Sequence, residues 1–374
     1  MTDIAYWKTF LAVYAFCWGA IWGSFLNVVI WRLPRGKSLS HPPSHCPVCS
    51  TPIRPWDNVP IFAWLIWLRG KCRACGTSIP VRYPAIELLT GLLGLALWLH
   101  VSADTLAAQP LQVIAIPFFF HFFFMTALVS ITFIDLDMGI IPNRLTTPCT
   151  VWGLIGALMW PKTGVWAAYF PSVDIVDAGL GVVVGWGVVL AIYYGYRLLT
   201  GKEGMGLGDG ALLGMIGANL GWQSLLFVMM FASFQGLIYA FAAAGFESWQ
   251  RRRGVNTTVL WRGVWKDEYW KSVDGSETHG YVGPVPAENA CAGASARETA
   301  VDDTDGVAPG GDPADAGASS GVSSNDAYGV TRDDDEEAFM KMGIPFGPFL
   351  ALAALEYIFV GRAFMQWVTA GALP

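Results

Sequence analysis

Charged side chains are scarce in this sequence. Asp, Glu, Lys and Arg make up 14% of its 374 residues, whereas a soluble protein carries about 25%. Hydrophobic residues make up 54%, and residues 210–246 contain no charged side chain. A soluble fold with this composition would need a core too large for one domain. We therefore exclude an ordinary soluble protein and predict an all-α integral membrane protein.

The amino terminus lacks the basic leader and the small-residue cleavage site of a removable signal peptide. We therefore expect residues 1–31 to be retained as the first transmembrane helix. Apolar runs of about 20 residues predict about eight transmembrane helices in all, two of them short. The expected spans are 8–32, 83–101, 111–134, 145–160, 178–196, two within 210–246 that break at "NLGWQS", and 344–360.

Basic residues are almost absent from every second loop. The loop 32–82, in contrast, holds eight Lys and Arg residues and a single acid, Asp57. Loops rich in Lys and Arg face the cytoplasm. We therefore place this loop in the cytoplasm and the amino terminus outside it. Asp135, at the end of the third span, and Asp209, at the start of the sixth, then emerge on the same cytoplasmic side.

Residues 247–343 differ in composition from the rest of the chain. Their first part is basic and aromatic, and the rest is mostly Gly, Ala, Ser and Asp with few apolar residues. Such a composition buries too little surface to offset the entropy lost on ordering. We predict a largely disordered cytoplasmic insertion, which is either a tolerated loop or a docking segment.

Four of the seven cysteines form two tight pairs in the loop 32–82. "CPVC" supplies Cys46 and Cys49, and "CRAC" supplies Cys72 and Cys75. Two such turns offer four thiolates, the ligand set of a structural zinc site. The alternatives are a thiol-exchange relay or no joint role. A cytoplasmic loop is reducing and disfavours persistent disulfides, so we predict one structural Zn²⁺.

Two aspartates stand where the chain enters or leaves the membrane, and ionisable groups there are costly and usually functional. Asp135 and Asp209 would form a pair that shares one proton, so that one activates water and the other protonates a substrate carbonyl. The alternative is structural, with Asp209 capping a helix and Asp135 serving as an interfacial anion. Asp137 stands two residues from Asp135 and so points to another helix face.

Seven motifs, in their order along the chain, resemble those of the bacterial type IV prepilin peptidase family. The resemblance covers nearly the whole chain outside residues 247–343. The motifs are "GSFLNVVIWRLPRG" (23–36), "CPVC", "NVPIFAWLIWLRGKCRAC" (58–75), "IPVRYPAIELLTGLL" (79–93), "FIDLDMGIIPNRLT" (133–146), "GMGLGDGALLGMIGANLGW" (204–222) and "IPFGPFLALAAL" (344–355).

The resemblance implies an enzyme with two activities. It would cleave the leader peptide of type IV prepilins or pseudopilins, then N-methylate the new amino terminus with S-adenosylmethionine as methyl donor. Asp135 and Asp209 match the family's catalytic pair, whereas Asp137 is out of register. The cysteine loop corresponds to the family's zinc-binding, methyltransferase-associated loop. Ala211, where many relatives have Lys, and Asn143, where many have Asp, depart from the pattern.

The implied protein is a multi-pass protein of the inner membrane. Its expected partners are prepilin substrates and the lipid bilayer, with no nucleic acid, and its oligomeric state is left open. The expected segments are the first transmembrane helix (1–31), the four-cysteine zinc loop (32–82), the transmembrane aspartic peptidase core (83–246), the polar insertion (247–343), and the last transmembrane helix with the carboxyl terminus (344–374).

Other functions remain open at this point. Within the family, the chain could be a peptidase without methyltransferase activity. A transporter would also carry acids at membrane depth, and a membrane thiol oxidoreductase would carry paired cysteines on the oxidising side. Glu87, which stands next to "RYPAI", is a further candidate functional acid, or else a packing residue.

We predict that deleting residues 302–335 leaves membrane insertion and leader cleavage intact, because this stretch has too little apolar surface to belong to a core. The measurement is prepilin cleavage by membranes that contain equal amounts of each protein. Lost cleavage at a normal membrane level would instead make the insertion part of the substrate site.

Overall fold

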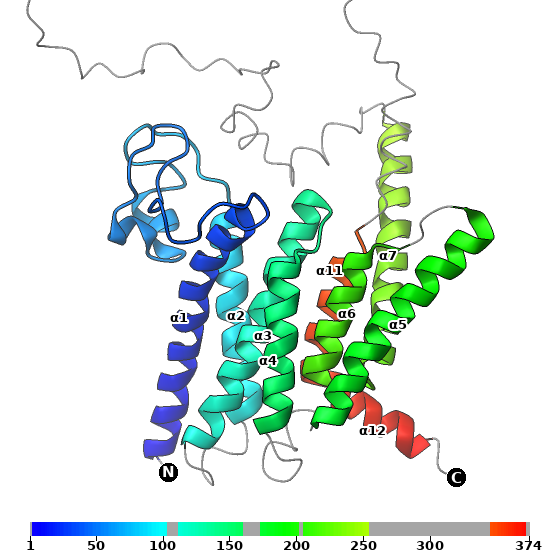
Figure 1. Ribbon diagram of the computed structural model, residues 1–374. Coiled ribbons are helices and arrows are strands. Elements are labelled where there is room, and N and C mark those ends of the chain that lie inside the picture. The colour runs from blue at the N-terminus through cyan, green and yellow to red at the C-terminus, as the bar shows by residue number, and fades with distance from the viewer. Residues whose placement is uncertain (1, 103–110, 160–172, 202–204, 254–344, 372–374) are drawn as a thin grey trace, which may run out of the picture. The chain divides into compact units, whose positions relative to one another are not determined.

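The computed structural model describes residues 2–102, 111–159, 173–201, 205–253 and 345–371. The described residues all belong to one structural unit. They are mostly helical and include no strand (Figure 1), which confirms the all-α prediction for this part of the chain. The elements are α1 (Thr2–Arg32), η1 (Pro55–Asn58), η2 (Ala63–Trp67), α2 (Arg82–Ser102), α3 (Leu111–Met138), α4 (Asn143–Met159), α5 (Ile175–Thr200), α6 (Leu207–Leu220), α7 (Ser224–Arg252), α11 (Gly347–Glu356), η4 (Tyr357–Gly361) and α12 (Arg362–Gly371).

Five of these helices are long and apolar enough to cross a membrane. Their spans are Tyr6–Arg32, Arg82–Ser102, Ile114–Met138, Ile175–Thr200 and Ser224–Phe246. α4 has 17 residues and α6 has 14, and the apolar segment Gly347–Gly361 is also short. A helix therefore occupies each predicted span, but eight complete crossings remain a prediction.

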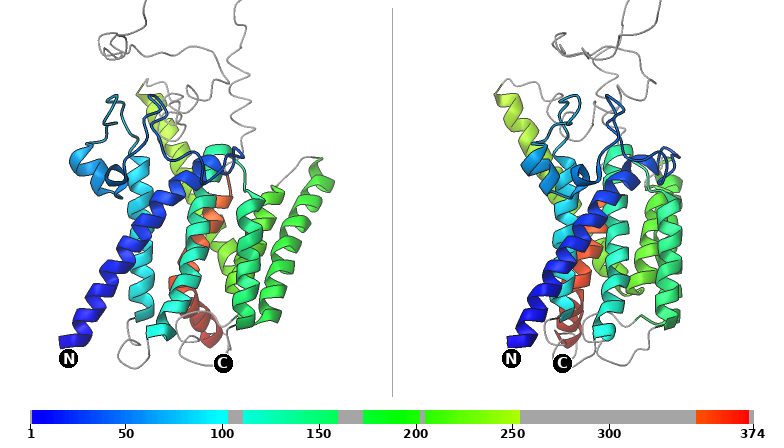
Figure 2. Two further views of the ribbon diagram at one scale, coloured as in Figure 1. Left: turned by 60° about the vertical axis from the view of Figure 1, so that its left-hand side comes forward. Right: turned by 90° about the vertical axis from the view of Figure 1, so that its left-hand side faces the viewer.

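α3 is the most buried of the five membrane-capable helices. In its apolar window 72% of the residues are buried, against 22% in both α5 and α7. The aromatic block "FFFHFFF" supplies much of this core, including Phe118, Phe122 and Phe124. The helices α1, α2, α4 and α11 all pack against α3, an arrangement that can be followed in Figure 2. α3 therefore holds its carboxyl-terminal aspartates in a fixed place.

α5 and α6 approach each other through glycines. Gly181 on α5 and Gly217 on α6 lie so close that a methyl group on either would collide with the backbone of the other. One turn along, a methyl group on Gly185 would lie 2.7 Å from the amide nitrogen of Gly214. Small residues permit such close packing between membrane helices. α6, which carries Asp209, is thereby fixed against α5.

The break predicted at "NLGWQS" is confirmed. α6 ends at Leu220 and α7 begins at Ser224. Gly221 takes a φ of 83° in the turn, a left-handed conformation that glycine adopts without steric cost. Asn219 donates a hydrogen bond of 3.1 Å to the Cys149 carbonyl and so ties α6 to α4.

α7 runs past Phe246, where the charge-free stretch ends, and continues to Arg252. The first residues of the predicted insertion 247–343 are thus helical. The rest of that insertion, and with it the expectation of disorder, lies outside the described residues.

We predict that Gly181→Ala destabilises the protein by about 1–3 kcal/mol, because the added methyl group must push α5 and α6 apart. Gly187→Ala is the matched control, since no atom lies within 4 Å of a methyl group at that position on α5. The measurement is the midpoint of thermal unfolding in detergent. Equal midpoints for the two variants would contradict the close packing of α5 on α6.

Candidate active site and metal centre

Asp135 lies in the last turn of α3 and is buried, with 5% of its surface exposed. α3 ends because Gly139 takes a φ of 65°, and the Gly139 N–H donates back to the Asp135 carbonyl at 2.8 Å. The Gly347 N–H, at the first residue of α11, donates to the Asp135 carboxylate. A methyl group on Gly347 would collide with that carboxylate, so only glycine allows this approach.

Asp209 lies in the first turn of α6 and is also buried, at 9% exposed. Its N–H donates to the Gly206 carbonyl at 3.1 Å, and the backbone of Gly206 in turn hydrogen-bonds to the Asp209 carboxylate. Every residue from Asp209 to Leu220 is buried. Asp209 is therefore held against its own helix start and has little freedom to turn towards solvent.

The structure brings Asp135 and Asp209 close enough for their charges to interact. Ile141, in the turn between α3 and α4, lies between the segments that carry them. A methyl group added to Gly208 would lie 3.1 Å from its Cβ, and one added to Gly347 would lie 3.1 Å from its Cδ1. The end of α3 and the starts of α6 and α11 thus meet at one point. Their catalytic role stays a prediction.

Asp137 takes no part in this pair. Its two carboxylate oxygens accept hydrogen bonds of 2.8 Å and 2.6 Å from the Arg82 guanidinium at the start of α2. Arg82 also lies over the Phe133 ring, 5.2 Å from its centre. The two carboxylates of the "FIDLDM" stretch therefore have separate surroundings, one facing α11 and the other joining α3 to α2.

Two residues of the site were not singled out in the sequence, namely Gly347 and Ile141. Both lie in quoted motifs, "IPFGPF" and "IIPN", but local sequence does not show that these motifs meet. Ala211, where many relatives have Lys, is 7% exposed in α6. A lysine at this buried position would have to place a charge among apolar helices.

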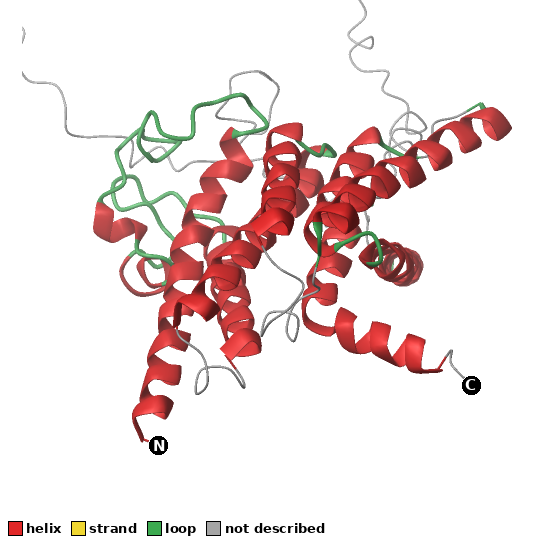
Figure 3. Ribbon diagram, turned by 60° about the horizontal axis from the view of Figure 1, so that its bottom comes forward, coloured by secondary structure: helices red, strands yellow, loops and turns green. Residues whose placement is uncertain are grey.

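The cysteine loop joins α1 to α2 and is largely irregular, shown as green chain in Figure 3. Its two C-x-x-C turns have the same backbone hydrogen bonds. The Cys46 N–H donates to the Thr51 carbonyl at 2.9 Å, and the Cys46 carbonyl accepts from the Ser50 N–H at 2.8 Å. The turn that begins at Cys72 repeats both bonds at the same spacing. Each turn therefore presents its two thiols in one direction.

The four thiols gather into one cluster. Their sulfur atoms all lie within 4.8 Å of one another, and none of the four residues forms a disulfide. The Sγ atoms of Cys46 and Cys75 are 3.8 Å apart, and those of Cys49 and Cys72 are 4.0 Å apart. A tetrahedral site with metal–sulfur bonds of about 2.3 Å has sulfurs about 3.8 Å apart. The cluster thus fits one metal ion.

A bidentate ion pair joins two parts of the cysteine loop. Arg73, next to Cys72, donates from Nε to the Asp57 carboxylate at 2.9 Å and makes a second bond from its terminal nitrogen. The Asp57 side chain is only 8% exposed. The Arg73 guanidinium holds the pKa of the Asp57 carboxyl below its usual range. The only acid of the loop is therefore already bound to a cation.

Two family models match this chain. The bacterial peptidase A24 N-terminal domain matches residues 17–101, and the type IV leader peptidase family matches residues 122–241. A prepilin leader peptidase/N-methyltransferase from Neisseria gonorrhoeae is 34% identical and covers 75% of this chain and 99% of its own length. The chain belongs to the type IV leader peptidase family. The resemblance that the motifs indicated is thus confirmed.

Other relatives carry the same description. The one from Aeromonas salmonicida is 37% identical over 260 residues, covering 62% of this chain and 80% of its own length. The one from Myxococcus xanthus is 38% identical over 235 residues, covering 62% and 63%. No solved structure matches the chain significantly. The family's two models divide the sites, with the cysteines in the first and both aspartates in the second.

We predict that the purified protein carries about one metal ion per chain, because four thiolates form a closed coordination shell. A Cys46→Ser, Cys72→Ser double variant should lose it. Cys17→Ser, which changes a thiol outside the cluster, is the control. The measurement is metal analysis of protein purified without chelators. A metal-free wild type whose four thiols alkylate freely would rule the site out.

Proposed function

We propose that this protein is a membrane aspartic endopeptidase that cleaves the leader of type IV prepilins and pseudopilins at the cytoplasmic face and then N-methylates the new amino terminus. One observation carries the proposal. Two buried carboxylates, Asp135 and Asp209, come from helices that are far apart in sequence and lie close enough for their charges to interact. The relatives, all described as prepilin leader peptidase/N-methyltransferases, support the same activities.

Two neighbouring carboxylates that share one proton suffice for peptide hydrolysis. The ionised carboxylate takes a proton from a water molecule, whose oxygen adds to the scissile carbonyl carbon. The protonated carboxylate gives its proton to the carbonyl oxygen. Breakdown of the tetrahedral intermediate breaks the carbon–nitrogen bond, and the leaving amine takes up a proton. Asp135 and Asp209 would perform both transfers between them.

The glycines around the pair have two roles in this mechanism. The N–H groups of Gly347 and Gly206 orient the two carboxylates. The missing side chain of Gly347 also lets α11 approach Asp135 closely, since a methyl group there would collide with the carboxylate.

The position of the pair along the helices matches the expected substrate. A prepilin leader is short and basic and is followed by an apolar helix that stays in the membrane, so its scissile bond lies near the cytoplasmic interface. Asp135 is in the last turn of α3 and Asp209 in the first turn of α6. A transporter would instead place such acids near the middle of broken helices. The helix-end position therefore favours the peptidase.

The cysteine cluster suits Zn²⁺ among the metals, because a closed set of four thiolates at tetrahedral spacing is typical of structural zinc. Cys46, Cys49, Cys72 and Cys75 would hold the ion. It would stabilise the fold of the loop, since two turns with few regular hydrogen bonds would be fixed to each other. We assign the methyltransferase activity to this loop, with S-adenosylmethionine as the methyl donor.

We predict that Asp135→Asn and Asp209→Asn each lower leader cleavage by about 10²–10⁴-fold, because asparagine keeps the shape but exchanges no proton. Asp137→Asn, the matched control two residues away, should keep most of the activity, since Arg82 binds its carboxylate outside the pair. The measurement is the mass of the prepilin product after incubation in detergent.

The three variants should insert normally and keep their metal, because the cysteine loop is a separate segment. They should also methylate a substrate that is already cleaved. Substantial cleavage by the 135 or the 209 variant would reject the paired-carboxylate mechanism.

A further inference from the structure

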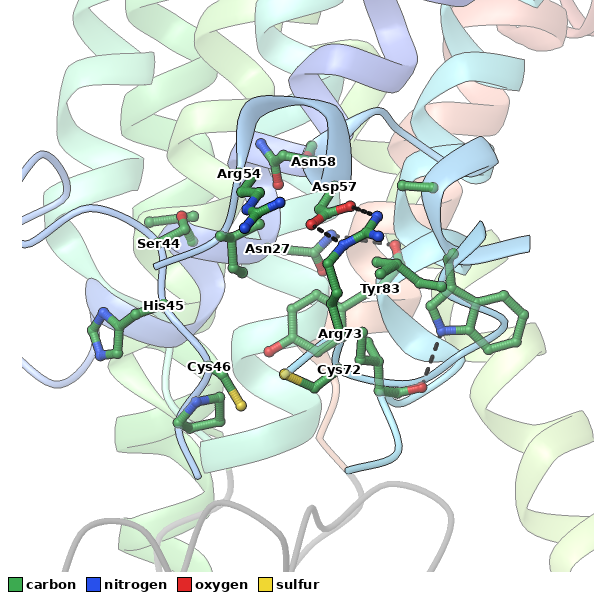
Figure 4. Close-up of a pocket in the computed structure, with 18 of the residues that line it drawn as sticks. Asn27, Ser44, His45, Cys46, Arg54, Asp57, Asn58, Cys72, Arg73 and Tyr83 are labelled. Atoms are coloured by element: carbon green, nitrogen blue, oxygen red, sulfur yellow. Dashed lines mark hydrogen bonds and ion pairs between the residues drawn. The ribbon is translucent and has the colours of Figure 1, made fainter. Parts of the chain in front are cut away.

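A cavity of about 430 Å³ lies between the cysteine loop and the cytoplasmic ends of α1 and α2 (Figure 4). This is the size of a small-molecule site. Neither aspartate of the peptidase pair lines it. Aromatic side chains and a few convergent polar groups do, including Trp31, Trp64, Tyr83, Asn27 and Glu87. Cys46 and Cys72 border it as well, so a metal in the cluster would fix part of its wall.

Glu87 is one of the two acids that line this cavity and is 8% exposed. Its Oε2 accepts a 2.8 Å hydrogen bond from the Ile61 N–H, and the Ser24 hydroxyl also bonds to its carboxylate. Both donors are uncharged. They hold the carboxylate in place but do not neutralise it, so a cationic group entering the cavity would complement it.

The surrounding backbone is built to place this carboxylate. Ile61 adopts a φ of 62°, which is unfavourable for a β-branched residue and aims its N–H at Glu87. On the other side, Gly23 of α1 lets α2 approach so closely that an added methyl group would lie 2.6 Å from the Glu87 Cα. A residue that served only for packing would not need a strained donor.

The second carboxylate that lines the cavity, Asp57, is paired with a cation. Two guanidinium nitrogens of Arg73 donate to its carboxylate. A cationic ligand would therefore have to displace this arginine to bind Asp57. Trp64 and Tyr83 also line the cavity. Aromatic faces attract cations such as a sulfonium and stack on planar rings. The cavity thus offers the Glu87 carboxylate and several aromatic side chains, and Arg32, Arg54 and Arg73 line it as well.

We propose that this cavity is the methyl-transfer site: it binds S-adenosylmethionine against its aromatic walls, and Glu87 binds the new α-amino group of the cleaved substrate. The inference rests on the proposed function, whose methyltransferase part it localises. A pilin helix that stays in the membrane would present its new amino terminus at the cytoplasmic ends of the helices. Glu87, in the second turn of α2, stands at that level.

The reaction needs no group beyond these. The α-ammonium gives one proton to the Glu87 carboxylate, and the freed nitrogen lone pair attacks the methyl carbon. The bond from methyl carbon to sulfur breaks and its electron pair stays on sulfur. The sulfonium becomes a neutral thioether, and the amine becomes a methylammonium. Arg82, five residues before Glu87, is paired with Asp137 of α3, so both reactions would occur at the same end of the helices.

The first test uses the purified full-length, metal-loaded protein and a precleaved pilin peptide. Glu87→Gln keeps a hydrogen-bond acceptor for Ile61 but removes the charge. Methylation, read as the mass gain of the peptide, should fall at least about tenfold, while prepilin cleavage stays at the wild-type rate. Binding of S-adenosylhomocysteine should persist, because Glu87 holds the acceptor and not the donor. Glu356→Gln is the matched control, since this acid bonds to Gln235 of α7 outside the cavity.

The second test is independent of any variant. A photoreactive S-adenosylmethionine analogue should label peptides from residues 24–32 and 44–87 of the wild type. Label confined to other segments would overturn the site, and so would methylation by Glu87→Gln at the wild-type rate. If Glu87→Gln also loses prepilin cleavage, the variant is damaged as a whole, and the labelling pattern of the wild type then tests the proposed site. A wild type that forms no methylated product would instead overturn the proposed methyltransferase itself, so the two failures are distinguishable.

Discussion

A carboxylate buried among apolar helices is costly unless polar groups reach it. Within a helix, backbone N–H groups without a helical partner occur only in the first turn, and the structure uses them for Asp135 and Asp209. The start of α11 serves Asp135 through Gly347, and the start of α6 serves Asp209 through Gly206. This constraint places the pair at helix ends, and helix ends are where a water molecule and a peptide chain can arrive.

The same requirement is met in another way at Glu87. Its donor, Ile61, belongs to the loop and not to a helix start, and its left-handed backbone directs the N–H to the acid. The Asp135–Asp209 pair therefore depends on how the helices pack, whereas the cavity depends on how the cysteine loop folds. Unfolding of the loop would leave Asp135 and Asp209 with their backbone hydrogen-bond donors, Gly347 and Gly206.

Local sequence predicted the elements well but not their contacts. Apolar runs located the helices, because a membrane helix must be apolar over most of its length, and "NLGWQS" located the break between α6 and α7. The cysteine spacing predicted the cluster, since each turn is local. The contact of Gly347 with Asp135 could not be found in this way. It joins segments more than 200 residues apart along the chain, and the helical periodicity of a sequence does not predict contacts between distant segments.

α11 comes late in the chain, after the insertion that follows α7, yet it packs against α3 and supplies the N–H that orients Asp135. During synthesis, α3 and α6 enter the membrane well before residue 347 leaves the ribosome. Until then Asp135 lacks one of its hydrogen-bond donors and α11 does not cover α3. The surroundings of Asp135 are thus completed only when α11 packs against α3, long after both aspartates have been synthesised.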